Sequence, residues 1–167
     1  MALITPKNLG ANELNLADNY AFTGTVTGAG VSGKVLQVVH GQRSGANDST
    51  ASTSYVTTNQ ELTITPSATS SLILVQFTTG GYVYSGGDGK YTIYRDSTNL
   101  GSGSDSAMQR IYDGNGGQWV PLILSCVDNP STTSAVTYSL RFKSTTNTLF
   151  VNANQAESNY YVMEIAG

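Results

Sequence analysis

The stretch Tyr138-Ser-Leu-Arg-Phe-Lys143 alternates strictly between apolar and polar residues. Successive side chains of a β-strand point to opposite faces, so the three apolar residues share one face and the three polar residues share the other. The pattern predicts a strand with one face in a core and the other in water.

The stretch Leu72-Ile-Leu-Val-Gln-Phe77 departs from this alternation, because five of its six residues are apolar. A strand of this composition is covered on both faces. Its second face is covered either by another sheet or by another subunit.

The rest of the chain repeats short apolar runs between turn residues. Helix-forming residues do not gather at a spacing of 3.6, and Ser, Thr, Gly and Asn interrupt the chain almost every ten residues. Many short strands at such intervals are typical of a β-sandwich, and the jelly roll is a common arrangement of them. We therefore predict a jelly-roll-like antiparallel β-sandwich. Its predicted strands cover residues 35–40, 61–65, 72–78, 81–84, 91–95, 108–112, 119–126, 137–143, 148–152 and 160–165.

Two glycine-rich segments, "GGDGK" at 86–90 and "DGNGG" at 113–117, are predicted to form the turns of hairpins. Neither has the ligand series of a calcium loop, and Asp88 has no second acidic residue near it in the sequence. We expect no metal site in either segment.

The segment "GTVTGAGVSGKV" at 24–35 fits the spacing of two phosphate-binding motifs. Both motifs need a helix after the loop, whose N-terminal N–H groups hold the anion. The residues after Lys34 are β-branched and extended in character, and Val35 stands where a P-loop has its Mg²⁺-binding hydroxyl. We expect a glycine-rich lead into a strand, and no nucleotide or other cofactor.

The charge of the chain is low, with 11% charged residues and a net charge of −3. Basic residues occur singly, which disfavours a nucleic-acid partner. No apolar run approaches the length of a membrane helix, and the first ten residues lack the features of a signal peptide. We expect a soluble protein made in the cytoplasm, without membrane insertion.

Cys126 and His40 are the only cysteine and histidine. An internal disulfide and a thiolate metal cluster are therefore excluded, and Cys126 is expected to be a small core residue. We expect His40 to lie at a strand end or in a loop, because a catalytic triad would depend on this one residue. No spacing of Asp and Glu identifies a glycosidase pair. We predict no catalytic residue and no enzyme.

Residues 1–33 differ from the rest, because glycine and proline break any regular element while large apolar residues persist. An arm that lies on a neighbouring protein buries such side chains. We predict an anchoring arm at 1–33 and a β-sandwich domain at 34–167. The predicted anchoring residues are Leu14, Leu16, Tyr20 and Phe22.

Segments at both ends resemble the terminal module of tail-fibre-like proteins of marine tailed phages. They are "NLADNYAFTGTVTGAG" at 15–30, "KVLQVV" at 34–39, "LTITPSATSSLILV" at 62–75 and "VMEIAG" at 162–167. The resemblance implies a virion structural protein. Family members often carry a long repetitive region before this module, where this chain has residues 1–14. A short tail fibre, a tail adaptor or a capsid decoration protein, bound to other virion proteins, is therefore expected.

Virion surface modules with a jelly-roll head are commonly trimers, and by analogy we expect a homotrimer here. In a trimer the apolar strand at 72–77 forms a core between subunits. The predicted interface residues are Leu72, Leu74, Val75 and Phe77.

A carbohydrate-binding module that recognises a host surface glycan is the alternative function. Exposed aromatic side chains stack on sugar rings, and four aromatic residues lie beside glycine-rich loops. The candidate glycan contacts are Tyr82, Tyr84, Tyr112 and Trp119. Packing in the core is the other interpretation of Trp119, because large aromatic residues are highly buried on average.

Overall fold

The structure is a computed structural model that describes residues 33–153 and 157–167. The four predicted anchoring residues, Leu14, Leu16, Tyr20 and Phe22, lie outside the described residues. The arm and its boundary at residue 33 stay predictions.

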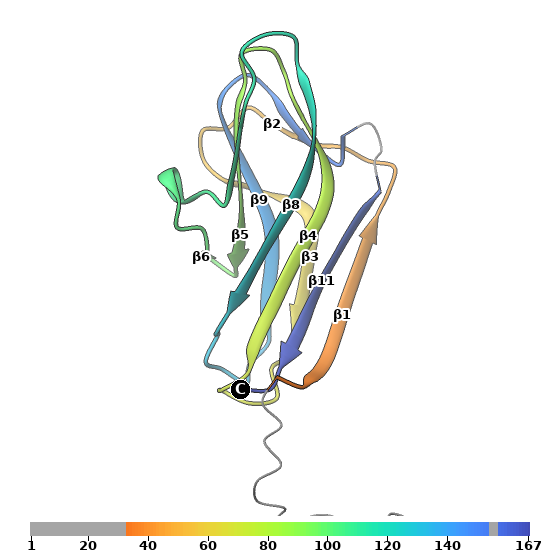
Figure 1. Cartoon of the computed structure of the whole chain (residues 1–167), viewed down its shortest axis with the longest axis vertical. Helices are drawn as coiled ribbons and strands as arrows, with labels where there is room; N and C mark the ends of the chain where they lie inside the picture. The colour runs from red at the N-terminus through yellow and green to blue at the C-terminus, as the bar shows by residue number, and fades with distance from the viewer. Residues whose placement is uncertain (1–32, 154–156) are drawn as a thin grey trace, which may run out of the picture. The chain divides into compact units, whose positions relative to one another are not determined.

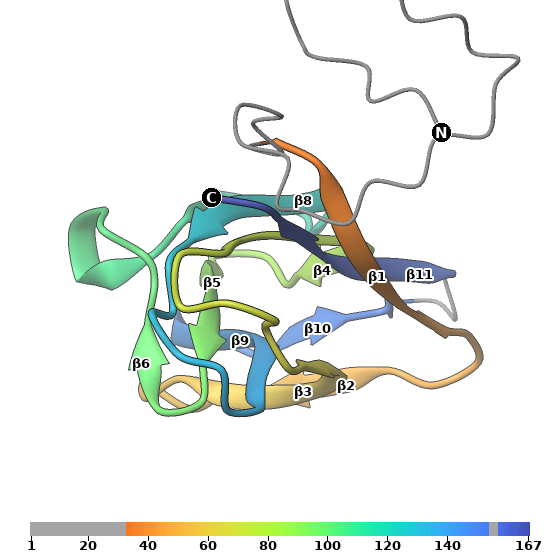
Figure 2. The same ribbon diagram turned by 90° about the horizontal axis from the view of Figure 1, so that it is seen from below.

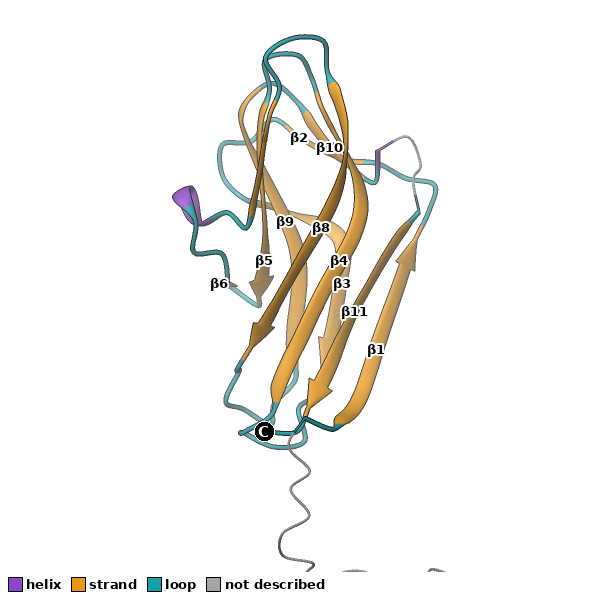
Figure 3. Ribbon diagram, viewed as in Figure 1, coloured by secondary structure: helices purple, strands orange, loops and turns teal. Residues whose placement is uncertain are grey.

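The described chain is built mainly from strands, and the short 3₁₀ turn η1 lies at Ser104–Ser106 (Figures 1 and 3). The strands are β1 (Val35–Arg43), β2 (Asp48–Thr50), β3 (Val56–Ile64), β4 (Leu72–Val83), β5 (Asp88–Arg95), β6 (Thr98–Asn99), β7 (Gln109–Tyr112), β8 (Gln118–Asp128), β9 (Val136–Thr146), β10 (Leu149–Val151) and β11 (Ser158–Ile165).

These strands form two antiparallel sheets that lie face to face (Figure 2). In the first sheet β1 pairs with β11, β11 with β4, and β4 with β8. β10 takes the place of β11 beside the last residues of β4, and β2 pairs with β10. In the second sheet β3 pairs with β9, β9 with β5, and β5 with both β7 and β6.

The strand order is that of a jelly roll. Without the short β2, β6 and β10, eight strands remain, and their places along the chain are 1-8-3-6 in the first sheet and 2-7-4-5 in the second. Two interlocked Greek keys produce this order. The prediction of a jelly-roll-like antiparallel β-sandwich is confirmed.

The apolar residues that alternate along β9 face the core, as the sequence predicted. Tyr138, Leu140 and Phe142 have at most 1% of their surface exposed and pack between the sheets. On the other face, Arg141 lies over the ring of Tyr94. Lys143 lies over the ring of Tyr55 in the same way. The long stems of these cations cover part of the outer face.

The division of residues 72–84 into two strands is wrong. β4 continues without a break from Leu72 to Val83, through Gly80 and Gly81. A Cβ atom on Gly81 would lie 2.8 Å from the Cδ1 atom of Leu122 on β8, so this glycine allows a close approach between two paired strands. The strands β2 and β6 were not predicted. They have three and two residues respectively, which is too short to show an alternation of apolar and polar residues.

The two glycine-rich segments contain the positive φ angles that their sequences predict, at Gly86, Gly116 and Gly117. However, they do not close hairpins within one sheet. The first connects β4 to β5 and the second connects β7 to β8, and each pair lies in different sheets. Asp88 does not belong to the turn but begins β5.

Candidate functional site

The outer face of the first sheet carries no charge along β1, β11, β4 and β8. The outward positions of these strands, read from their alternating burial, hold no Asp, Glu, Lys or Arg. One row crosses all four strands through the paired residues Val38, Met163, Leu74 and Val127. Val38 and Val127 are 53% and 59% exposed. We call the part of this surface around that row, apart from Tyr82 and Trp119, the uncharged face.

The four predicted interface residues divide between the two sides of β4. Val75 and Phe77 have no exposed surface and belong to the core between the sheets. Leu72 and Leu74 are half-buried on the uncharged face. Contact with another subunit is therefore open to Leu72 and Leu74 but not to Val75 and Phe77.

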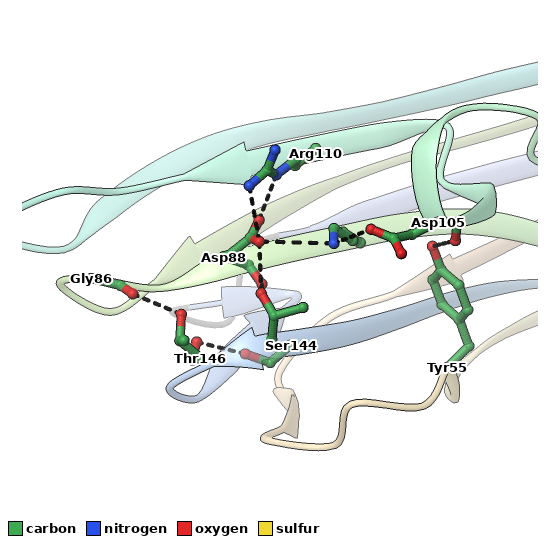
Figure 4. Close-up of polar contacts among 9 residues, drawn as sticks. Tyr55, Gly86, Asp88, Asp105, Arg110, Ser144 and Thr146 are labelled. Carbon is green, nitrogen blue, oxygen red and sulfur yellow. Dashed lines mark hydrogen bonds and ion pairs between the residues drawn. The ribbon is translucent and has the colours of Figure 1, made fainter.

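The outer face of the second sheet carries an ionic network around Asp88 (Figure 4). Arg110 donates to both carboxylate oxygens of Asp88 over 2.7 and 3.1 Å, and the Thr145 hydroxyl donates to one of them over 2.6 Å. Lys90 lies 3.8 Å from Asp88 and is also paired with Asp105. Hydrogen bonds from Arg110 hold the pKa of Asp88 below its usual value. The network ties β5, β7 and β9 to η1, and its charges are mutually neutralised.

A cluster of aromatic side chains lies on the first sheet, where β4 pairs with both β8 and β10. The ring centroid of Tyr82 lies 4.6 Å from that of Trp119, 5.1 Å from that of Tyr84 and 6.3 Å from that of Phe150. The Tyr84 and Phe150 rings are 5.7 Å apart. Trp119 is 59% exposed and Tyr84 is 48% exposed. We call these four residues the aromatic cluster.

Strand pairing assembles the aromatic cluster from distant parts of the chain. Tyr82 is opposite Trp119 on β8 and opposite Phe150 on β10. The backbone of Gly117 approaches the Tyr82 hydroxyl so closely that a Cβ atom there would collide with it. A glycine with a positive φ is therefore needed where the 113–117 loop meets the cluster.

Two hollows adjoin the aromatic cluster and share Trp119 and Ala153 in their linings. The first hollow has a volume of about 340 Å³ and is lined mainly by the four rings, together with Asn47. The second has a volume of about 580 Å³, and Thr78, Pro121 and Glu157 contribute to its lining.

The structure brings together three of the four candidate glycan contacts. Tyr112 lies apart from them, because it belongs to β7 of the second sheet, where it is opposite Asp88. Phe150 was missed by the sequence analysis. Its place between the buried Leu149 and Val151 indicates an outward side chain, but the neighbouring strand cannot be read from the sequence. The exposure of Trp119 contradicts the interpretation of this residue as core packing.

The remaining single residues have local roles. Val35 begins β1 directly after Lys34, so the glycine-rich segment leads into a strand as predicted. The expectation that His40 lies at a strand end or in a loop is wrong, because His40 is exposed within β1, opposite Tyr161. Cys126 is half-buried and packs against the core. Burial raises the pKa of the Cys126 thiol to about 11, with a further contribution from Asp128, so the thiol stays protonated and unreactive at neutral pH.

Within residues 33–153 and 157–167, no group of His, Cys, Asp and Glu side chains is arranged to hold a metal ion. No helix in this part of the chain is long and apolar enough to cross a membrane.

No protein-family model matches the sequence, and no curated protein matches it. The fold is similar to chains in solved structures of infectious bursal disease virus. For the Gx strain the identity is 12% and the TM-score 0.38, over 81% of this chain and 38% of the viral chain. For a mutant VP2 protein of this virus in T=1 particles, the identity is 14% and the TM-score is 0.36. The match covers 79% of this chain and 37% of the viral chain. This chain thus spans less than two fifths of those chains, and similarity at this level carries no information on function.

Proposed function

We propose that the chain is a structural protein of a bacteriophage virion, in which the β-sandwich projects from the particle and residues 1–33 attach it. The jelly-roll strand order is the observation that carries this proposal, because the fold is common among virion proteins. The phage-like segments at 15–30, 34–39, 62–75 and 162–167 support it independently. A short tail fibre, a tail adaptor and a capsid decoration protein all agree with these features.

The proposed role is not enzymatic. Several acidic side chains of the described sandwich serve the fold: Asp88 and Asp128 hold arginines, and Glu164 accepts hydrogen bonds from three side chains. Carboxylates held in this way position strands and loops.

The uncharged face supports the homotrimer. Subunit interfaces are depleted of charged residues at their centre, and Val38, Met163, Leu74 and Val127 form an apolar row of this kind. Three copies of such a face can meet around a threefold axis without bringing an unpaired charge into the contact. We expect three copies to meet through this surface, with Leu72 and Leu74 among the contacts.

The experiment that tests the virion role is electron cryomicroscopy of the phage particle, labelled with an antibody against the sandwich. We expect label at regular positions on the capsid or on the tail. Label on neither structure, with the protein found only in infected-cell lysate, would contradict the proposal. Particles from a phage that lacks the gene are the control, and they carry no label.

A further inference from the structure

We propose that the aromatic cluster and its two hollows bind an uncharged oligosaccharide, one without carboxylate, sulfate or phosphate groups. The proposal does not depend on the virion role, because it follows from the side chains of the sandwich alone.

The exposure of the rings is the first observation. Trp119 is 59% exposed and Tyr84 is 48% exposed, so about half of the surface of each residue is in contact with solvent. Large aromatic residues contribute strongly to binding because they offer a wide apolar surface together with a polar group. The C–H faces of a sugar ring match such a surface.

The packing of the rings against one another is the second observation. The Tyr82 ring packs against the rings of its three neighbours in the cluster, with centroid distances of 4.6 to 6.3 Å. Side chains that are already ordered lose little conformational entropy when a ligand binds. The cluster is therefore a preformed platform.

The linings of the hollows define the ligand class. Asn47 lines the first hollow, and Thr78 and Glu157 line the second. Thr78 and Glu157 each accept one hydrogen bond, from Gln76 and Gln42, and their oxygens have further acceptor capacity for sugar hydroxyls. No Lys or Arg of the described chain is found in either lining. An anionic sugar would lose hydration there without gaining an opposite charge, which is unfavourable.

The position of Trp119 defines the extent of the ligand. Since both hollows include Trp119, a ligand that occupies both lies across this ring. A chain of several sugar units fits this arrangement better than a monosaccharide, which would occupy one hollow.

Trp119 also provides the measurement, because it is the only tryptophan of the chain. The full-length protein is titrated with neutral hexasaccharides of glucose, galactose, mannose and xylose, and with sulfated and uronic-acid hexasaccharides of equal length. We expect a saturable change in tryptophan emission with at least one neutral probe and none with the anionic probes. An absence of response to all neutral probes at about 10 mM, roughly ten times a Kd of 1 mM, would overturn the proposal, as would a response to anionic probes alone.

Variants then locate the site. Calorimetry with the neutral probe is expected to show at least a tenfold loss of affinity for Trp119→Ala and substantial retention for Trp119→Phe, which keeps an aromatic face. Tyr112→Ala is the matched control, an exposed tyrosine on the other sheet, and it should bind like the wild type. Equal binding by Trp119→Ala would overturn the proposal.

Tyr84→Ala is a second test of the site, which remains informative if the Trp119 variants do not fold. Tyr84 lies just beyond the end of β4, is about half exposed, and leaves the fluorescent reporter in place. We expect a clear loss of affinity with an unchanged thermal unfolding curve. Binding at wild-type strength by this folded variant would count against the site.

Discussion

At the scale of single residues, Glu164 shows how a charge is stabilised inside the sandwich. Its side chain has no exposed surface. One carboxylate oxygen accepts hydrogen bonds from the Ser67 amide and hydroxyl and from the Ser71 hydroxyl, over 2.6 to 2.7 Å, and the other accepts one from Gln37. A buried charge is tolerated when it is hydrogen-bonded in this way. The residue thereby fastens the loop before β4 to β11 and β1.

The stability of the protein is predicted to fall in acid because of Glu164. Burial alone would raise the pKa of its carboxyl, but the hydrogen bonds from Ser67, Ser71 and Gln37 outweigh burial and lower the pKa to about 2. The folded pKa is below the unfolded one, so the stabilisation is complete above about pH 4.5 and disappears as pH falls toward 2.

Glu164→Gln tests this prediction by urea unfolding between pH 2 and 7. We expect a loss of about 1–3 kcal/mol at pH 7, because an amide group then faces the hydroxyl and amide donors. The decline of stability below pH 4.5 should also become shallower. Glu61→Gln, at an exposed position on β3, is the control. An acid profile identical to that of the wild type would show that Glu164 does not stabilise the folded state.

At the scale of elements, β4 carries residues of both surfaces for which we propose a function. Its inward residues form the core, its outward Leu74 belongs to the uncharged face, and its outward Tyr82 centres the aromatic cluster. The apolar residues of β4 between Leu72 and Val75 are thus divided between the core and the uncharged face. One strand supports the proposed subunit contact and the proposed glycan site.

Val127→Glu is predicted to dissociate the trimer. Val127 is 59% exposed in the single chain, so the substitution costs the isolated sandwich little but would bury a charge where the three copies meet. Light scattering should give three times the 17.6 kDa chain mass for the wild type and a single chain mass for the variant.

Thr57→Glu is the matched control for this prediction, since it introduces the same charge at an exposed position of β3, in the other sheet. It should remain trimeric. A wild-type protein that has the mass of one chain at micromolar concentration would contradict the trimer. A trimeric Val127→Glu variant would instead place the interface on another surface.

At the scale of the whole molecule, the sandwich has its own core. The buried apolar cluster is drawn from residues between Leu62 and Val162, with Val39 and Val56 packed against it. The ends of the described chain also meet, because the Gly33 amide donates to the Ala166 carbonyl and the Ala166 amide donates to the Lys34 carbonyl. These contacts close the domain from residue 33 onward.

Deletion of residues 1–30 is therefore predicted to leave the sandwich folded but unable to attach to the virion. Truncated and full-length proteins are mixed with particles that lack them, and the sedimented fractions are compared. Leu16→Asp and Phe22→Asp should weaken attachment far more than the control Lys7→Ala, because we expect an apolar contact. Equal attachment of the truncated protein would exclude the arm as the anchor, and an unfolded truncated protein would move the domain boundary.

The sequence by itself determined the all-β class, the approximate position of nine of the strands and the jelly-roll-like sandwich, because alternation of period two and turn residues are local properties. The tertiary structure decided that β4 is one strand, since the space at Gly81 depends on Leu122 of a distant strand. It also decided which apolar residues face outward and which rings meet. Tyr82, Trp119 and Phe150 become neighbours only through the pairing of β4 with β8 and β10, and such long-range register follows from the packing of the whole sandwich.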